Sequence, residues 1–235
     1  MRNKERIVIP DIHGRKFWKD ALEYIKSGVP TIFLGDYLDP YSYEGITPEQ
    51  AIYNFEEILE VAKDKNTKVT LLTGNHDCTY IYPEEGICEC RTDYLGFPKI
   101  QKLFWDNLDL FSLATTDGNI LYSHAGIHKD WLSFVGITEE DIIDQPLSKL
   151  SHKIVDSLLV VSWYRGGWGD YGSPVWADVR EFSGNSLGDI TQVVGHTQQK
   201  EKPVRVGNVI CLDCRECFYV DPEGDVRYLK NDIAV

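Results

Sequence analysis

The chain of 235 residues lacks any apolar run that approaches the roughly 20 residues of a membrane-spanning helix. Its first residues, 1–6, are mostly polar or charged and lead directly into an apolar segment, so they do not form a secretory signal. Internal repeats, low-complexity tracts and linkers are missing as well. These absences predict a single domain over residues 1–235, located in the cytoplasm, with its six cysteines reduced.

Positive charge is scarce in this sequence. The 24 lysines and arginines are outnumbered by 37 aspartates and glutamates, which gives a formal net charge of -13. Such a surface repels nucleic-acid backbones and anionic lipid, so we expect neither nucleic acid nor membranes as partners. An anionic substrate would also be repelled unless bound cations reversed the local charge. The composition therefore favours metal ions in any site that binds an anion.

The first half of the chain alternates between predicted strands and helices. Short apolar segments predict strands over 6–10, 30–34 and 68–73, and apolar residues spaced three and four apart predict helices over 17–25 and 47–62. The second helix opens with Thr47 as N-cap, a proline in the first position and Gln50 completing a capping box. This order is typical of a parallel sheet covered by helices.

The second half is expected to be richer in strands. Helices are predicted over 97–107 and 138–160, a hairpin at 117–118, loops over 79–96 and 163–188, and strands over 119–122, 191–194, 204–206, 208–213 and 216–220, with a last strand after the turn at 221–224.

Five clusters of polar residues each follow a predicted strand. They are Asp11 with His13, Asp36 with Asp39, Asn75 with His76, His124, and His196. Ligands of open α/β sheets bind at the carboxyl ends of the strands. Carboxylate and imidazole ligands together suit Mn, Fe, Zn or Co rather than Ca, and one carboxylate can bridge two ions about 4 Å apart. Any one cluster could be a loop held by hydrogen bonds, but five together predict a metal site.

These clusters carry a resemblance to a known family. Asp11-Ile12-His13-Gly14, Gly35-Asp36-x-x-Asp39, Gly74-Asn75-His76-Asp77, His124-Ala125-Gly126 and Gly195-His196-Thr197 resemble, in order, the five motifs of the calcineurin-like metallophosphoesterases. The similarity is greatest to the branch of serine/threonine phosphoprotein phosphatases and bacterial diadenosine tetraphosphatases. It covers nearly the whole chain and implies an α/β fold, a four-layer α/β/β/α sandwich, with metal-dependent phosphoric ester hydrolase activity.

The resemblance also implies roles for single residues. Asp11 and His13 would hold one divalent ion, Asp36 would bridge, and Asn75, His124 and His196 would hold the second. Two ions, Mn or Fe/Zn, would supply hydroxide for attack on a phosphomonoester. His76 would be the general acid, with Asp39 accepting its other ring proton.

The implied substrate is a phosphorylated small molecule, a nucleotide or a phosphoprotein. One alternative is a hydrolase of dinucleoside polyphosphates. Another is a non-catalytic scaffold of the same fold, which the retention of the six predicted ligands and of the acid pair disfavours.

The sequence departs from the family pattern after Asp39. Pro40 stands where the family motif has an arginine that grips the phosphate in protein phosphatases. Arg165 and Arg180 are therefore the candidate phosphate-binding residues, because the planar guanidinium suits phosphate oxygens, although each could equally form a surface salt bridge. Gln198 occupies the position where many phosphodiesterase members have a further ligand histidine, which favours monoester or pyrophosphate substrates.

Several residues outside these motifs could also form a site. Cys211, Cys214 and Cys217 could bind zinc, but strand alternation would place some of them on opposite faces, so core packing is expected. Cys88 and Cys90 receive no role. The aromatic loop residues, which could stack on a nucleobase or pack on one another, are Trp163, Tyr164, Trp168, Tyr171 and Trp176. His128 and His152 are expected on the surface.

Overall fold

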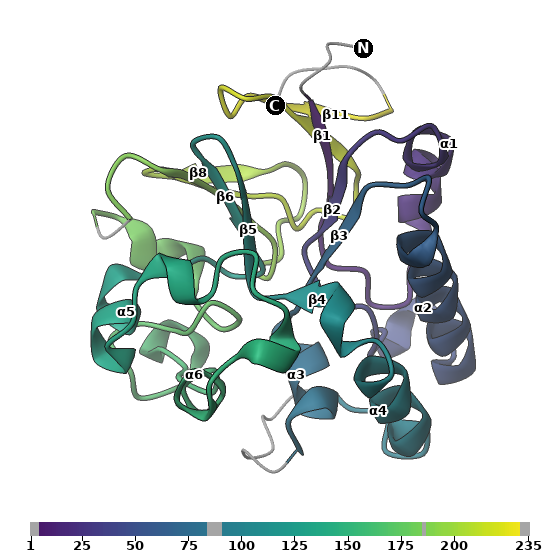
Figure 1. Cartoon of the computed structure of the whole chain (residues 1–235), viewed down its shortest axis with the longest axis horizontal. Coiled ribbons are helices and arrows are strands. Elements are labelled where there is room, and N and C mark those ends of the chain that lie inside the picture. The colour runs from purple at the N-terminus through teal and green to yellow at the C-terminus, as the bar shows by residue number, and fades with distance from the viewer. Residues whose placement is uncertain (1–4, 84–90, 185–186, 231–235) are drawn as a thin grey trace.

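The structure is a computed structural model that describes residues 5–83, 91–184 and 187–230. Two sheets lie side by side at its centre (Figure 1). Within the described residues, one sheet has six strands in the order β11-β10-β1-β2-β3-β4 and the other has five in the order β5-β6-β7-β9-β8. The strands are β1 Arg6–Ile9, β2 Thr31–Phe33, β3 Val69–Leu72, β4 Phe111–Ser112, β5 Ala114–Asp117, β6 Ile120–Ser123, β7 Thr191–Val194, β8 Val204–Val206, β9 Val209–Cys211, β10 Phe218–Val220 and β11 Val226–Tyr228.

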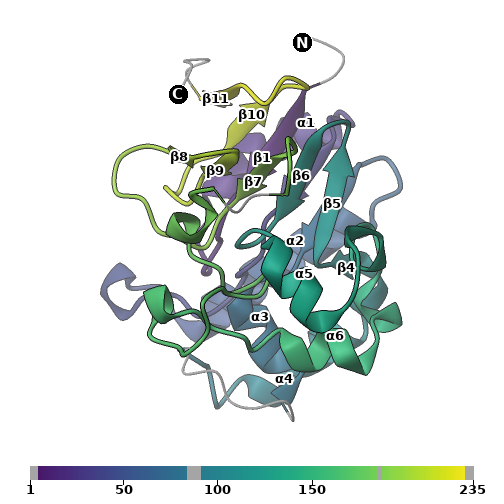
Figure 2. The ribbon, with the colours of Figure 1, turned by 90° about the vertical axis from the view of Figure 1, so that its left-hand side faces the viewer.

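Helices flank the two sheets. They are α1 Leu22–Lys26, α2 Pro48–Lys63, α3 Asn75–Ile81, α4 Phe97–Trp105, α5 Lys129–Val135 and α6 His152–Ser157, with several short 3-10 turns. Helices α1 and α2 lie on the outer side of the first sheet, and α5 and α6 lie on the side of the second sheet (Figures 1 and 2). Helix α2 begins as predicted, because the Thr47 hydroxyl accepts from the Gln50 N–H and the Gln50 side chain accepts from the Thr47 N–H.

Parallel pairing brings the strand ends of each sheet to one edge. Strands β1, β2, β3 and β4 are parallel, with Ile7 opposite Thr31 and Thr31 opposite Val69. In the other sheet β6, β7 and β9 are parallel. The predicted strand-helix-strand order is thus confirmed, and the loops that follow β1, β2 and β3 lie at the lower ends of these strands, near the middle of the molecule in Figure 1.

Side-chain alternation along the strands produces the layers. Phe33 packs in the cluster that contains the helix residues Ile25 and Phe55. Its neighbours Ile32 and Leu34 pack between the sheets, in the cluster that contains Val193 and Ile210 of the second sheet. The predicted α/β sandwich of two sheets flanked by helices is therefore confirmed.

The same alternation separates three of the cysteines. Cys211 packs on the outer side of the second sheet, Cys214 packs against the cluster between the sheets, and Cys217 packs in the cluster on the helix side of the first sheet. The described residues contain no group of three possible metal ligands that includes a cysteine. Core packing accounts for these three cysteines, whereas Cys88 and Cys90 lie outside the described residues.

Two predicted segments are wrong in part. The helix over 138–160 is replaced by two 3-10 turns, Glu139–Asp141 and Leu147–Lys149, and by the short α6. Pro146 has no N–H and disrupts a helix interior, and both it and Ile143 instead form β-bridges, with Ser112 and Ala114. Of the predicted loop over 79–96, residues 79–81 belong to α3 and residues 84–90 lie outside the described residues.

His128 is buried rather than on the surface, at 2% exposure. Its Nδ1 accepts from the Asp130 N–H and caps α5, and its ring stacks on Tyr171 at 5.6 Å. His152 is exposed, as predicted.

Among the described residues, no helix is long and apolar enough to cross a membrane.

Candidate metal centre

Six predicted ligands from both sheets meet at the strand ends. Asp11, Asp36 and Asn75 follow β1, β2 and β3 of the first sheet, and His124 and His196 follow β6 and β7 of the second. Asp11, Asp36, Asn75 and His124 are at most 3% exposed, and His13 is 4% exposed. Buried carboxylates are costly unless a cation or hydrogen-bond donors compensate for them. The six side chains therefore form a candidate cation site.

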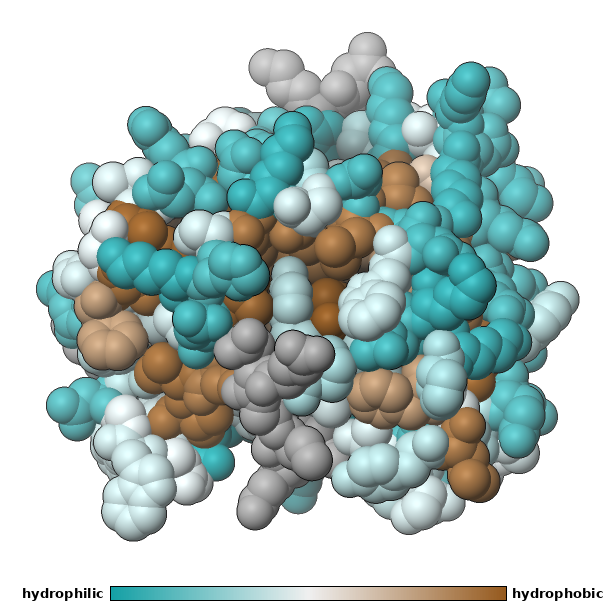
Figure 3. Space-filling model, turned by 60° about the horizontal axis from the view of Figure 1, so that its bottom comes forward, coloured by the Kyte–Doolittle hydropathy of each residue, from teal (hydrophilic) through white to brown (hydrophobic). Residues whose placement is uncertain are grey.

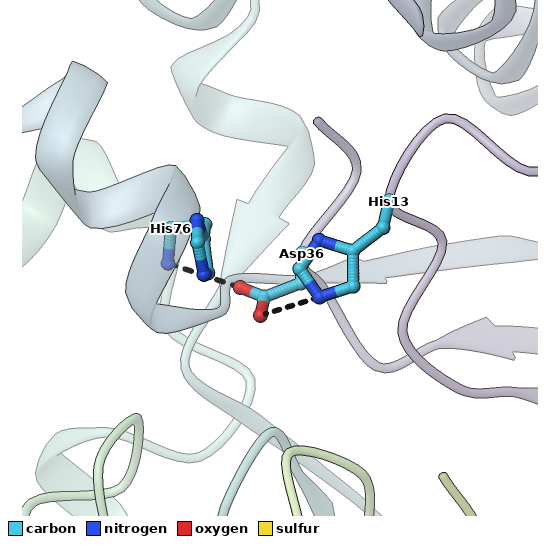
Figure 4. A group of neighbouring side chains, drawn as sticks. All are labelled: His13, Asp36 and His76. Atoms are coloured by element: carbon cyan, nitrogen blue, oxygen red, sulfur yellow. Dashed lines mark hydrogen bonds and ion pairs between the residues drawn. The ribbon is translucent and has the colours of Figure 1, made fainter. Parts of the chain in front are cut away.

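Asp36 lies at the middle of this site. It belongs to two groups whose ligand atoms lie within 4.8 Å of one another, namely His13, Asp36 and His76, and Asp36, His124 and His196. One carboxylate oxygen, Oδ2, is 3.5 Å from His13 Nε2 and 3.6 Å from His124 Nε2. Figure 4 shows the Asp36 carboxylate between the His13 ring and His76. A carboxylate shared by two groups is the arrangement needed to bridge two ions.

Backbone carbonyls orient two of the imidazoles. His13 Nδ1 lies 2.8 Å from the Leu38 oxygen, and His124 Nδ1 lies 2.8 Å from the Leu34 oxygen. Because a carbonyl only accepts, each Nδ1 carries the proton and each Nε2 is left as an acceptor that faces Asp36. Burial lowers the pKa of His13 to about 3, so its ring is neutral, the form that binds metals.

The second half of the site brings three potential ligand atoms together, and two of them, His124 Nε2 and Asn75 Oδ1, are both acceptors. His124 Nε2 is 3.1 Å from Asn75 Oδ1 and 3.1 Å from His196 Nδ1. His196 Nε2 is buried and has no hydrogen-bond partner among the described residues. Burial, and then the charge of Arg165, lower the pKa of His196, which keeps this ring neutral too. A divalent cation would satisfy these facing lone pairs, so the donor set fits a metal ion.

The two carboxylates of the site differ in their surroundings. Burial opposes ionisation of Asp36, but His124, His76 and His13 outweigh it and hold the pKa of Asp36 below its usual range. Burial raises the pKa of Asp11, although its oxygens accept from the His196 N–H at 2.9 and 3.1 Å. Neither His124 nor this N–H outweighs the burial of Asp11, and a bound cation would add the missing compensation.

Glycines allow the backbone to approach these carboxylates. A Cβ at Gly74 would lie 2.1 Å from Asp36 Oδ1, and a Cβ at Gly195 would lie 2.1 Å from Asp11 Oδ1. Asp77, for which the sequence leaves open a ligating or an orienting role, accepts from the Gly74, Asp36 and Tyr37 N–H groups at 2.8, 2.8 and 3.1 Å. Its carboxylate thus fastens the loops after β2 and β3 to each other.

The predicted acid pair lies beside this centre. His76 Nδ1 is 2.9 Å from Asp39 Oδ2, and the other oxygen of Asp39 accepts from the Tyr80 hydroxyl. Burial, followed by the Asp39 charge, raises the pKa of Tyr80 far above its usual value, so the phenol remains a donor. Tyr80 was not identified from the sequence. The only sequence feature that points to it is its position one helical turn after His76. The pair can hold a proton at His76 and stabilise the charged ring.

A family model supports this geometry. The model for the calcineurin-like phosphoesterases matches residues 6–200, which include all of the predicted ligands and the acid pair. The chain belongs to the calcineurin-like phosphoesterase family.

Relatives with curated names lie among the protein phosphatases. The chain is 36% identical over 130 residues to a Schizosaccharomyces pombe protein provisionally named as a serine/threonine-protein phosphatase, covering 51% of this chain and 38% of that protein. It is 32% identical over 136 residues to a catalytic subunit of protein phosphatase 2A from Dictyostelium discoideum, covering 54% of this chain and 39% of the relative. The chain therefore aligns with less than half the length of either relative.

A solved structure shows the same fold over the whole chain. The cold-active protein-tyrosine phosphatase of a psychrophilic Shewanella species superposes with a TM-score of 0.62 and 17% identity. The match covers 99% of this chain and 80% of that chain. The chain thus has the fold of a known phosphatase structure.

The two predicted phosphate-binding arginines are placed differently in this phosphoesterase. Arg165 Nη2 donates to the His196 carbonyl at 3.2 Å and to the Thr197 hydroxyl at 2.8 Å, and its Nε lies 3.0 Å from Asp178. Arg180 is bound to both oxygens of Asp178 at 2.7 and 3.0 Å, and its side chain is 58% exposed. The structure brings Arg165 to the edge of the metal centre, whereas Arg180 is directed to Asp178 rather than to the predicted ligands.

Two other arginines near the centre were missed from the sequence. Arg15 donates from Nη1 to the Asp11 carbonyl at 3.4 Å and forms an ion pair with Glu44 at 3.0 Å. Arg91 donates to the Asp39 carbonyl, and its guanidinium lies over the Tyr41 ring. Residue 91 is far from every motif in the sequence, so only the folded chain reveals its position.

The aromatic loop packs largely on itself. Trp163 stacks on Tyr164 at 3.8 Å, Tyr171 stacks on His128, and the Trp176 ring meets His196 edge-on at 5.7 Å. Trp168 is fully exposed. The face of the molecule at the lower edge of Figure 1 mixes apolar and hydrophilic side chains (Figure 3).

Proposed function

We propose that this chain is a dinuclear metal-dependent phosphatase that hydrolyses phosphomonoesters. The observation that carries the proposal is the buried Asp36 carboxylate, which two groups of potential ligands share; one of these groups includes His76, which is paired with Asp39. Asp11 and His13 would complete one metal site with Asp36. The second site would consist of Asp36, Asn75, His124 and His196. Two ions of the Mn or Fe/Zn type, when bound, would polarise the phosphoryl oxygens and lower the pKa of a water molecule.

The protein's own contribution is to orient ligands and to move a proton. The Leu38 and Leu34 carbonyls fix the rings of His13 and His124 with Nε2 toward Asp36. His76 uses Nδ1 to donate to Asp39, which leaves Nε2 to protonate the leaving alkoxide as the P–O bond breaks. Asp39 stabilises the imidazolium before the transfer and holds the ring afterwards. The products are an alcohol and inorganic phosphate.

The substrate is a phosphorylated small molecule or a phosphoprotein. The protein-phosphatase names of the two curated relatives support a phosphoprotein. Pro40 removes the motif arginine, so phosphate affinity in this chain depends on arginines from other segments.

One observation favours a second candidate, a dinucleoside polyphosphate hydrolase. Trp163 is stacked on Tyr164 and is 58% exposed, and the adjoining Arg165 reaches the His196 carbonyl. This stacked pair, whose Trp163 ring is exposed and whose neighbour Arg165 contacts the His196 loop, offers a platform for a nucleobase.

Hydrolysis of chemically distinct esters tests the proposal. The protein loaded with Mn(II) would be assayed on a chromogenic phosphomonoester, the matching diester and a dinucleoside tetraphosphate, with and without a chelator. We expect monoester turnover that chelation abolishes and that His76→Asn lowers about a hundredfold or more. His152→Asn, which changes an exposed histidine outside the site, is the matched control and should keep wild-type rates.

Each contrary result has a definite meaning. Turnover of the tetraphosphate alone would favour the second candidate. Activity that survives chelation, or no hydrolysis of any substrate with metals demonstrably bound, would contradict the proposed mechanism. Loss of bound metal in His76→Asn, measured by mass spectrometry of the metal content, would make His76 a ligand rather than the acid.

A further inference from the structure

Arg91 contacts both members of the acid pair. Its main-chain oxygen lies 3.1 Å from His76 Nδ1. Its Nε and Nη2 donate to the Asp39 carbonyl oxygen at 3.3 and 3.2 Å. The guanidinium is therefore fastened to the backbone of Asp39, the residue that pairs with His76 in the proposed acid pair.

An aromatic ring holds the plane of this guanidinium. Its central carbon is 3.6 Å from the centroid of the Tyr41 ring, and Tyr41 in turn meets the His13 ring edge-on at 5.3 Å. Stacking on an aromatic face orders the planar group and leaves its N–H edge available. The Tyr41 ring thus lies between the Arg91 guanidinium and His13, which links Arg91 to the edge of the metal centre.

The other arginines near the centre have carboxylate partners. Arg15 is paired with Glu44, and Arg165 and Arg180 are both paired with Asp178. Among the described residues, Arg91 has no carboxylate partner: its side chain meets only a carbonyl oxygen and the Tyr41 ring. Within the part of the chain that the structure describes, no carboxylate therefore compensates its positive charge.

Arg91 also has donors to spare. A guanidinium carries five N–H groups, and Nη1 of Arg91 makes no hydrogen bond with the described residues. The residue is exposed, so a ligand can reach it. In a chain with a net charge of -13, an exposed and unneutralised guanidinium beside the centre is a specific attraction for an anion.

We propose that Arg91 binds the phosphoryl oxygens of the substrate through the free edge of its guanidinium. The inference rests on the proposed function, because it takes the ligand of the site to be a phosphate ester. A planar fork matches two phosphate oxygens, whereas a lysine ammonium presents a single point charge. Arg91 is thus the substrate-binding arginine of this chain, and Arg165, whose charge is shared with Asp178, contributes less.

A fastening role makes a different prediction from a binding role. If Arg91 only fastened its segment to Asp39, its loss would disturb His76 and lower kcat without changing the affinity for phosphate. A residue that binds the phosphoryl oxygens must change the affinity for inorganic phosphate, which is also the product. Equilibrium binding of phosphate therefore separates the two roles without depending on turnover.

Calorimetric titration of the Mn-loaded protein with inorganic phosphate is the test. We expect Arg91→Ala to weaken phosphate binding about tenfold or more, and Arg91→Lys to weaken it less. Arg205→Ala, which removes an exposed arginine on β8, is the matched control and should bind phosphate within twofold of wild type. The inhibition constant of phosphate against a chromogenic monoester should follow the same order.

Three outcomes would overturn the inference. They are phosphate affinity in Arg91→Ala within twofold of wild type, an equal loss in Arg205→Ala, and a metal-loaded wild type that binds no phosphate. Thermal unfolding identifies a variant that fails to fold, and Arg91→Lys then gives the answer in its place. A wild type that binds phosphate but hydrolyses no ester would contradict the proposed function. In that case, weaker phosphate binding by Arg91→Ala would still support the role of Arg91 in binding phosphate.

Discussion

A single methyl group at Gly74 should strongly weaken metal binding by this protein. The Cβ of Gly74→Ala would lie 2.1 Å from Asp36 Oδ1 and 2.8 Å from the Asp36 backbone nitrogen. Non-bonded carbon contacts are comfortable only near 3.5 Å, so the carboxylate must move by roughly 1 Å or the two loops must separate. Asp77 opposes the separation, because it hydrogen-bonds to both loops.

The expected loss is large because Asp36 is shared by both halves of the site. The same oxygen accepts from the His76 N–H at 3.0 Å, so its displacement also disturbs the residue proposed as acid. Changes that misplace a ligand typically cost 10- to 100-fold in metal affinity. With both ions affected, we expect Gly74→Ala to bind Mn about a hundredfold more weakly, which is about 2.7 kcal/mol.

Metal content and Mn titration of the purified variant measure this effect. Gly118→Ala is the control, since Gly118 lies at the β5–β6 turn with φ of +60° and nothing within 4 Å of an added Cβ. Alanine in that conformation costs about 1 kcal/mol of stability but leaves the metal centre intact. Wild-type Mn affinity and stoichiometry in Gly74→Ala would refute the proposal that the Asp36 carboxylate bridges the ions.

Two further predictions concern histidine protonation and the Tyr80 hydroxyl. In metal-free protein, burial lowers the folded pKa of His13 to about 3, so the unfolded chain takes up the proton first as the pH falls. The contribution to stability is complete above about pH 6.5 and is lost toward pH 3, at about 1.4 kcal/mol per pH unit. Urea unfolding at pH 6.5 and pH 5 should therefore show a loss about 2 kcal/mol smaller in His13→Gln, and an identical loss would contradict the argument. Tyr80→Phe removes a donor to Asp39 and should slow an alkyl phosphate roughly tenfold while slowing p-nitrophenyl phosphate little, because a good leaving group needs no acid. Tyr82→Phe, whose hydroxyl has no hydrogen-bond partner among the described residues, is the control; equal losses on both substrates would contradict a role for Tyr80 through the acid pair.

The strand ends could be predicted from the sequence because their signals are local. A short apolar run followed by Asp11 or Asp36 predicts both a strand and the residue at which it ends. Parallel pairing then brings the carboxyl ends of different strands together. The prediction of a helix over 138–160 was wrong, and the reason is also local. Its apolar spacing reflects Ile142, Leu147 and Ile154 packing from successive short turns, which Pro146 interrupts.

Residues whose role depends on distant partners could not be predicted in this way. Arg91 has its position only because its segment returns to Asp39, which is 52 residues earlier in the chain. The guanidinium of Arg180 could bind a phosphate, but in the folded chain its Nε and Nη2 donate to the two carboxylate oxygens of Asp178. His128 is a polar residue without neighbouring motif residues in the sequence, so a surface position is predicted. In the structure it is buried because it caps α5 and stacks on Tyr171. Charge compensation and stacking are properties of the folded neighbourhood, and the sequence pattern does not contain them.

The backbone of the site shows why glycine-rich motifs surround these ligands. Six of the described non-glycine residues adopt positive φ, and four of them belong to the site, with φ between +44° and +63°: His13, Asp36, Asp39 and His196. Each such residue costs of order 1 kcal/mol or more, and these residues tend to cluster at functional sites. Hydrogen bonds from fixed neighbours maintain the strain, as the Asp77 carboxylate does for the Asp36 N–H and Asp11 does for the His196 N–H. The loops therefore hold their ligands in place before any ion binds, and the stability lost there is offset by the packing between and around the two sheets.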